Sequence, residues 1–197
     1  MTYLHLSKKP ILKKNLKPIF GNQFETNKLF YNPKGLWFAD NNCWIVNNNL
    51  SIETKYLYKL DISKLSIYKI SKLSELDRFI KKYYNPNRNS IAETVDWKRV
   101  YKDYDGIMIC PYLIKNKTLI SIHHDLSFTD KTIVNDIILG NKNIIPKKFK
   151  PNIRTFLEKV KAGKIKEKIV NRLWYVGWEV SSGVIWKNYR KLKLTQI

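Results

Sequence analysis

The amino-acid sequence predicts a single domain of the α+β class, with small mixed or antiparallel sheets and flanking helices. Strand-like runs occur on both sides of amphipathic helical segments. The length of 197 residues fits one hydrophobic core. Hydrophobic residues make up 44% of the chain, and six Trp, twelve Tyr and eight Phe are among its residues. Disordered chains lack so many large apolar side chains, so we expect the chain to fold.

Six short segments are predicted to be strands because they are rich in β-branched and aromatic residues and end at polar residues, Gly or Pro. They are Tyr3–Ser7, Gly35–Ala39, Trp44–Val46, Lys55–Ile62, Leu65–Ile70 and Ile107–Tyr112. The short Ser63-Lys64 connection predicts that the fourth and fifth form an antiparallel pair. The aromatic segment Trp174–Trp186 is expected to be a strand hairpin.

Two helices are predicted from capping patterns. Ser74 followed by Asp77 precedes an amphipathic run that Pro86 stops. Ser90 with Glu93 offers a second cap, and this helix is expected to end near Gly106.

Two longer segments complete the expected organisation of residues 1–197. Residues 113–140 are predicted to be an insertion with two short strands and a short helix, and not a separate domain. Residues 147–172 are a basic helical segment, whose charges are typical of a solvated helix face.

The formal net charge is +21, from 37 Lys and Arg against 16 Asp and Glu. Such a charge favours nucleic acid or another anionic partner, with Lys147 to Arg172 as the expected contact region. Only six of the 37 cations are Arg, however, and Lys, Asn and Ile are all abundant. An AT-rich genome would produce this composition, and recognition surfaces favour Arg over Lys. We therefore favour compositional bias over recognition as the origin of the charge.

The two cysteines are expected to be buried thiols in a reducing compartment. Cys43 and Cys110 lie far apart in apolar sequence, without the spacing of a metal or disulfide motif. The first residues lack the apolar run of a signal peptide, and no segment has the length of a membrane span. We expect a cytoplasmic protein without a membrane partner.

Glu179 and His5 are the main candidates for chemistry. Glu179 is the one charged residue of an aromatic segment, so it is either a functional or a hydrogen-bonded buried acid, or an edge-strand residue facing solvent. His5 lies inside the first strand, where a structural role is the simpler interpretation. His123, His124 and Asp125 are adjacent but lack a third ligand cluster, so no metal is expected.

The common nucleotide-binding and hydrolase motifs are absent from the sequence. Aromatic residues alternate with Lys between Tyr56 and Tyr68, a pattern compatible with stacking of single-stranded nucleic acid. Packing in a strand core explains the same pattern equally well.

Three segments together resemble an uncharacterised family of proteins from large DNA viruses. They are NPKGLWFADNNCW (Asn32–Trp44), DWKRVYKDYDGIMICPY (Asp96–Tyr112) and WYVGWEVSSGVIW (Trp174–Trp186). The matching features are GLWF followed by Trp, then YDGI, then Trp, an acid, Val, a small residue, SG and IW. The chain has Glu179 where this family has Asp, and Val184 where it has Cys.

The opening YLHLS followed by GLWFA is also similar to the start of ADP-ribosyltransferase-like domains. The resemblance implies an α+β fold with a split pair of small sheets that binds NAD between them. It implies that His5 and Ser7 contact NAD, that Trp37 and Phe38 contact the nicotinamide ring, and that Glu179 is the catalytic acid. The resemblance also implies that His5 belongs to the catalytic site with Glu179.

The implied chemistry suits these residue types. Cleavage of the nicotinamide bond develops positive charge on the ribose, which a preorganised carboxylate stabilises. Imidazole binds hydroxyl or amide groups, and aromatic rings stack on nicotinamide, so no metal is required. The sequence therefore favours an enzyme that transfers ADP-ribose, to a protein or nucleic-acid acceptor, or hydrolyses NAD. The alternatives are a non-enzymatic basic module that binds nucleic acid and a structural protein of a virion.

Overall fold

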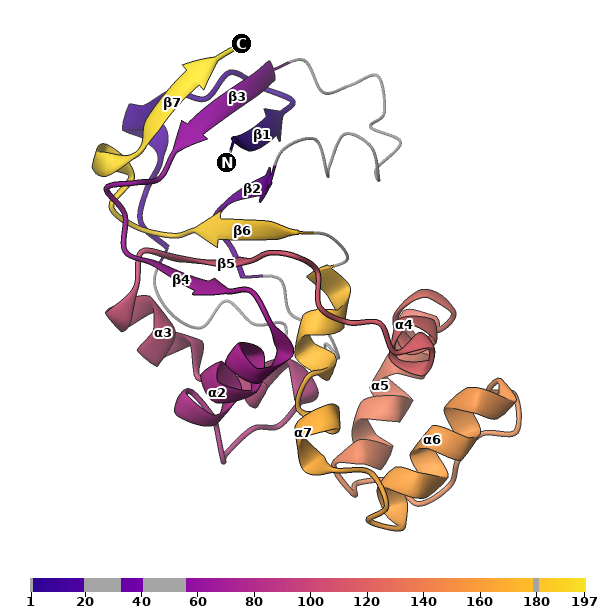
Figure 1. Ribbon diagram of the computed structural model, residues 1–197. Coiled ribbons are helices and arrows are strands. Elements are labelled where there is room, and N and C mark those ends of the chain that lie inside the picture. Colours follow the sequence, from indigo (N-terminus) through magenta and orange to yellow (C-terminus); the bar gives the residue numbers. More distant parts are fainter. Residues whose placement is uncertain (1, 20–32, 41–55, 179–180) are drawn as a thin grey trace.

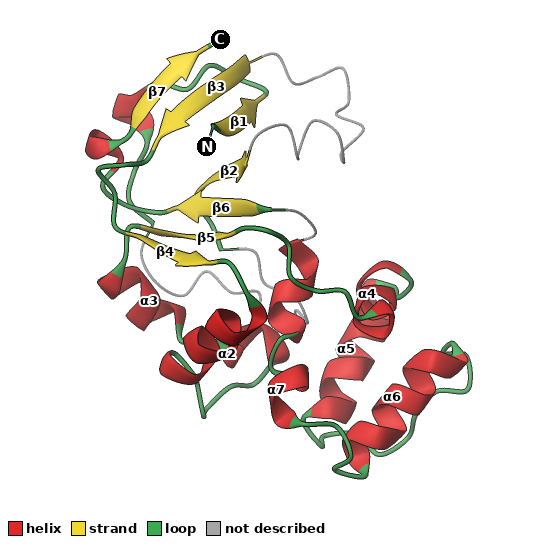
Figure 2. Ribbon diagram, viewed as in Figure 1, coloured by secondary structure: helices red, strands yellow, loops and turns green. Residues whose placement is uncertain are grey.

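The computed structural model describes residues 2–19, 33–40, 56–178 and 181–197. Within these ranges seven strands form one curled, mixed sheet in the order β4-β5-β6-β2-β1-β3-β7 (Figures 1 and 2). The strands are β1 (Tyr3–Ser7), β2 (Leu36–Asp40), β3 (Tyr56–Asp61), β4 (Ile67–Ile70), β5 (Gly106–Ile109), β6 (Ser182–Ile185) and β7 (Lys193–Gln196). Only the β4–β5 pair is parallel among these strands. The predicted α+β class is confirmed, although the strands join in one sheet and not in a split pair.

Six α-helices lie in the described residues, and they gather beside the β4-β5-β6 part of the sheet (Figure 1). They are α2 (Leu73–Lys82), α3 (Trp97–Asp103), α4 (Lys117–His124), α5 (Phe128–Ile138), α6 (Pro151–Lys161) and α7 (Glu167–Val170). Short 3₁₀ helices are η1 (Lys13–Asn15), η2 (Ile91–Thr94), η3 (Leu173–Trp178) and η4 (Tyr189–Lys191). None of the described helices combines the length and the apolar character needed to traverse a bilayer.

The sheet separates two hydrophobic cores. The larger core lies against the helices and contains the fully buried indoles of Trp97, Trp174 and Trp186. The smaller core contains Tyr3 and Phe38 together with the residues around η4. Side chains of consecutive strand residues point to opposite faces, so β2, β4, β5 and β6 each contribute to both cores.

Gly183 is required where β6 passes beneath Phe38. A Cβ atom at position 183 would lie 2.3 Å from Cζ of Phe38 and 2.7 Å from the carbonyl oxygen of Ile107. Any larger residue would therefore displace the Phe38 ring or the neighbouring strand β5.

The prediction that β3 and β4 form an antiparallel pair is wrong. β3 pairs with β1 and β7, whereas β4 is an edge strand that pairs in parallel with β5. Asp105 accounts for this arrangement, because its Oδ2 accepts from the backbone N–H of Ser66 at 3.0 Å and its own N–H donates to the Ser66 carbonyl at 2.8 Å. These two bonds attach the start of β4 to the start of β5.

The predicted hairpin at Trp174–Trp186 is also wrong in its first half. Leu173–Trp178 forms η3, in which Trp174, Tyr175 and Trp178 are all buried. A strand would direct neighbouring residues to opposite faces, whereas the helical turn directs all three rings into the larger core. The second half, β6, is a strand as predicted.

Residues 113–140 hold the helices α4 and α5 in place of the predicted strands. The side chain of Asn116 caps α4 by accepting from the N–H of Leu119, and Ser127 caps α5 by accepting from the N–H of Asp130. Such side chains satisfy the free N–H groups of a first turn. The histidines at 123 and 124 therefore lie at the end of a helix, with their rings 4.8 Å apart.

The two predicted capping boxes have other roles. Helix α2 begins at Leu73, so Ser74 lies within it, and Asp77 instead forms two hydrogen bonds of 2.7 Å with the guanidinium of Arg172. The helix expected after Ser90 is interrupted, because Asp96 caps a separate helix, α3. The basic segment is helical as predicted, in α6 and α7.

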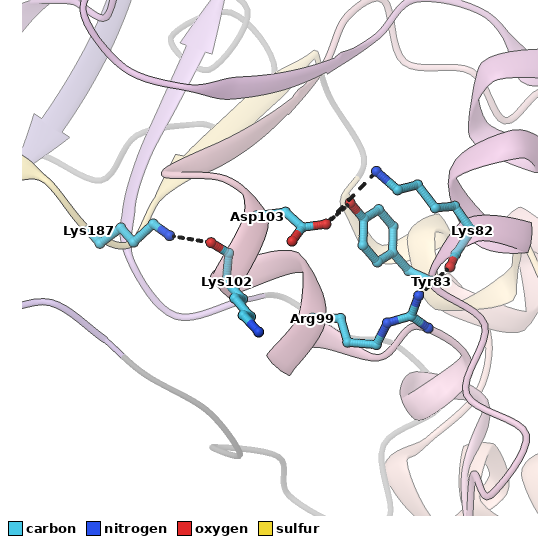
Figure 3. A network of polar contacts seen from close by, with 6 residues as sticks. All are labelled: Lys82, Tyr83, Arg99, Lys102, Asp103 and Lys187. Atoms are coloured by element: carbon cyan, nitrogen blue, oxygen red, sulfur yellow. Dashed lines mark hydrogen bonds and ion pairs between the residues drawn. The ribbon is translucent and has the colours of Figure 1, made fainter.

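A polar network connects α2, α3 and Lys187, the residue after Trp186 (Figure 3). The Tyr83 hydroxyl donates to Oδ2 of Asp103 at 2.6 Å, and Arg99 donates to the Lys82 carbonyl at 3.1 Å. Lys187 donates to the Lys102 carbonyl at 3.0 Å. Burial raises the pKa of Tyr83, and its bond to Asp103 raises it further, so the phenol stays protonated. The network therefore joins segments about 85 residues apart in sequence.

We expect Asp77→Ala to lower the free energy of unfolding by about 2 kcal/mol, because it leaves the guanidinium of Arg172 unpaired at a site where that side chain is 15% exposed. Chemical denaturation measures this change. Glu158→Ala, on the exposed face of α6, is the matched control and should change stability by less than about 0.5 kcal/mol. Equal effects of the two substitutions would contradict the role given to the pair.

Candidate functional site

The junction of β1 and β2 is the least paired part of the sheet. β1 pairs with β3 along five residues and β2 pairs with β6 along four. β1 and β2 pair only at Tyr3 with Asp40 and at Leu4 with Ala39. Beyond Leu4 no further residue pairs join these two described strands, so they diverge there.

His5 lies at this divergence and bridges it with its side chain. Its Nδ1 is hydrogen-bonded to the carbonyl oxygen of Trp37 on β2. A carbonyl only accepts, so Nδ1 carries the proton and Nε2 of the neutral ring is an acceptor. Burial lowers the pKa of His5, and the hydrogen bond to Trp37 offsets part of that effect. The ring is therefore neutral at pH 7 and presents an acceptor nitrogen.

Ser7 shares a face of β1 with His5, because residues two apart on a strand point the same way. Its hydroxyl donates to the carbonyl of Lys9 at 2.6 Å and accepts the N–H of Lys9 at 3.3 Å. Ser7 is half-buried, and these local bonds end the strand. A ligand hydroxyl would have to compete with them.

Trp37 and Phe38, the two predicted ring contacts, lie on opposite faces of β2. The Trp37 indole is half-buried, packs edge-on against Trp178 with ring centres 4.9 Å apart, and donates to the Pro33 carbonyl at 2.9 Å. Phe38 is fully buried and packs against Tyr3 at 5.3 Å. A nicotinamide ring therefore cannot stack on Phe38 in this structure, and the structure does not bring the two aromatic residues together.

Asp40 is a site residue that the sequence analysis missed. Its Oδ2 accepts from the thiol of Cys110 at 3.2 Å, whereas its buried Oδ1 has no hydrogen-bond partner in the described part of the chain. Asp40 lies directly opposite Tyr3 in the ladder, on the face that His5 also shares. Burial raises the pKa of Tyr3, and the neighbouring Asp40 and Cys110 raise it further. An acid directly after the apolar GLWFA run was the available signal in the sequence.

Glu179 lies outside the described residues, as do Cys43 and the predicted strand Trp44–Val46. It precedes β6 by three positions. Ser181 accepts the backbone N–H of Asp40 at 3.3 Å, and its hydroxyl accepts the N–H of Tyr112 at 3.0 Å. Ser181 therefore lies at the Asp40 end of β2.

The basic segment uses several of its lysines within the protein. Lys148 pairs with Asp130 at 2.6 Å and Lys150 pairs with Asp125 at 3.2 Å. These pairs attach the chain before α6 to α4 and α5. Exposed lysines of this segment that form no ion pair with any described residue include those at positions 159, 164, 166 and 168.

Across residues 2–19, 33–40, 56–178 and 181–197, no three His, Cys, Asp or Glu side chains are grouped in a way that could hold a metal ion. Comparisons of the chain with protein-family models, curated proteins and solved structures give no match. The proposals below therefore depend on the geometry of the residues and on the resemblance in sequence.

The lowered pKa of His5 predicts a specific pH dependence. Because the folded chain binds a proton at His5 less readily than the unfolded chain, whose histidine has the ordinary pKa of 6.5, stability is complete above that pH and falls as the pH decreases through it. His5→Gln removes this group, so its melting temperature should fall less than that of the wild type between about pH 8 and about pH 5.

Thermal unfolding at a series of pH values measures the difference. His124→Gln, which changes an exposed histidine, is the control and should keep the wild-type pH dependence. If His5→Gln keeps it too, the neutral buried imidazole is not the cause.

Proposed function

We propose that this protein binds NAD at the divergence of β1 and β2 and breaks the bond between nicotinamide and ribose. ADP-ribose then passes to an acceptor, either a protein or a nucleic-acid group, or to water. The observation that carries the proposal is His5, which bridges the gap between the strands and presents a neutral ring nitrogen there. The similarity of YLHLS and GLWFA to ADP-ribosyltransferase-like domains supports the same site.

His5 suits the binding of a ribose. Nε2 accepts a hydrogen bond from a hydroxyl group, and the bond from Nδ1–H to the Trp37 carbonyl holds the ring in one orientation. A side chain already held in the required rotamer loses little entropy when a ligand binds.

The proposal assigns the stabilising acid to Glu179, by the sequence resemblance, with Asp40 as a second acid on the His5 face. When the C–N bond breaks, its electron pair leaves with nicotinamide and positive charge develops on the ribose. A nearby carboxylate stabilises that charge. The acceptor oxygen or water then forms the new bond to the ribose and releases a proton. The carboxylate oxygen Oδ1 of Asp40, which is buried and has no partner among the described residues, suits a role near this charge.

We expect purified protein to bind NAD in calorimetry and to release nicotinamide, detected by chromatography of the same sample. Glu179→Gln should reduce the rate of release by about 100-fold or more, since it removes a preorganised charge, while binding of NAD and the melting temperature change little. His5→Ala should weaken NAD binding by about tenfold, the loss expected for one hydrogen bond.

Glu158→Gln, on the exposed side of α6, is the matched control and should leave both binding and release unchanged. Failure of the wild type to bind NAD at millimolar concentration would refute the proposal. A large fall in melting temperature of Glu179→Gln would instead identify Glu179 as a structural residue.

Binding of nucleic acid is the second candidate function, and the exposed lysines at positions 159, 164, 166 and 168, on α6, α7 and the turn between them, favour it. Without ion-pair partners among the described residues, they are free to neutralise phosphates, and the NAD proposal does not use them. Aromatic stacking between Tyr56 and Tyr68 is not favoured, because Tyr58 is buried and Tyr68 packs on Phe79 with ring centres 5.0 Å apart.

If these lysines bind a duplex, the logarithm of the association constant should fall linearly with the logarithm of the salt concentration, with a slope of about −3 to −4, from roughly 0.9 per neutralised phosphate. Fluorescence anisotropy with a labelled oligonucleotide measures this slope. Substitution of all four lysines by Gln should flatten it. A slope near zero in the wild type would remove this candidate.

A further inference from the structure

A cavity of about 660 Å³ lies within the curl of the sheet, away from the helices. Residues of both edge strands line it, from β4 at one end of the sheet and from β7 at the other. Its walls also include Tyr3 of β1, the last residues of β3 and the turn that leads to β4. Because residues of both edge strands line one cavity, the sheet curls far enough to form an open ligand site.

The charge of this cavity comes from three lysines on three different strands. Lys59 on β3, Lys69 on β4 and Lys193 on β7 all line it, and all three are exposed. In the described part of the chain none of them forms an ion pair. Three ammonium groups around one cavity repel one another, so an anion that enters it lowers their electrostatic energy.

One carboxylate, Asp61, lines the same cavity but is held by its own turn. Its Oδ1 accepts the N–H of Ser63 at 2.9 Å, and hydrogen bonds from Ser63 lower the pKa of Asp61, with smaller contributions from Lys193 and Lys64. Asp61 therefore stays charged and reduces the net charge of the lining from three positive to two. A diphosphate group, with two or more negative charges, balances that charge.

The remaining walls are apolar, and the cavity has the volume that an organic group requires. Tyr3, Leu60, Ile62, Leu65 and Ile67 line the cavity beside the lysines. Small-molecule sites combine such an apolar surface with a few polar groups, in volumes of about 300 to 1,000 Å³. The unpaired backbone groups of two edge strands add hydrogen-bonding partners for a base or a sugar.

From these features we infer that the cavity binds a nucleoside diphosphate or a ligand of the same chemistry, an organic group that carries a diphosphate. The lysines hold the phosphates and the apolar wall receives the organic group. This inference does not depend on NAD cleavage, because none of the lining residues belongs to the proposed catalytic set. Tyr3 is the one lining residue in the cluster with Asp40 and Cys110.

Calorimetric titration with ADP tests the inference. Wild-type protein should bind ADP with a dissociation constant below about 1 mM, and adenosine at least tenfold more weakly, since the phosphates provide the charge interaction. The double substitution Lys69→Gln and Lys193→Gln should weaken ADP binding by at least about tenfold. Because both lysines are exposed, the melting temperature should be unchanged.

Two matched variants separate this site from others. Lys164→Gln together with Lys166→Gln removes the same charge from the turn before α7 and should leave ADP binding unchanged. His5→Ala should also leave it unchanged, which distinguishes this cavity from the proposed NAD site. Absence of ADP binding, equal binding of adenosine, or an equal loss in the control double variant would overturn the inference.

Discussion

The fold depends on a ladder of two residue pairs between β1 and β2. On one side of it lie β6, β5 and β4 with the helices, and on the other lie β3 and β7. Among the described residues, the pairs Tyr3 with Asp40 and Leu4 with Ala39 are all that connects these two parts of the sheet by regular pairing. His5 adds a side-chain bond to the Trp37 carbonyl just beyond them. The sheet therefore remains continuous while it opens a gap lined by polar groups.

The distribution of packing follows from this junction. The larger core with its buried tryptophans supports the β4-β5-β6-β2 part, whereas a smaller core around Tyr3, Phe38 and η4 supports the other face. The strands β1, β3 and β7 have no α-helix beside them in Figure 1 among the described residues. The curl of the sheet leaves the lysine-lined cavity accessible in that part of the molecule. The candidate binding sites thus lie in the part of the sheet that has no α-helix beside it among the described residues.

Local sequence predicted the elements whose pattern is itself local. Tyr3–Ser7 and Leu36–Asp40 have the residue types of a strand and are strands, and α2 has the apolar spacing of a helix. The run from Trp174 was ambiguous, because a fully apolar segment suits a buried helix as well as a strand. The parallel pairing of β4 with β5 depends on Asp105, 39 positions from Ser66, which no local pattern indicates.

In the candidate site, too, the sequence predicted local features and missed contacts between distant residues. His5 and Ser7 share a face as strand alternation requires, and the same rule places the neighbouring Trp37 and Phe38 on opposite faces. The pairing of Asp40 with Cys110 joins positions 70 apart and became visible only in the folded chain. Charge was the least informative feature, because lysines of the basic segment pair with Asp125 and Asp130 while three lysines outside it line one cavity.

The most direct measurement is nuclear magnetic resonance of protein with ¹⁵N-labelled histidine, recorded before and after addition of NAD, with His5→Gln to assign the signal. The account predicts that His5 is neutral with its proton on Nδ1 at pH 7, and that NAD shifts the Nε2 resonance of His5 but not those of His123 and His124. A proton on Nε2, or a His5 spectrum that saturating NAD leaves unchanged, would contradict it.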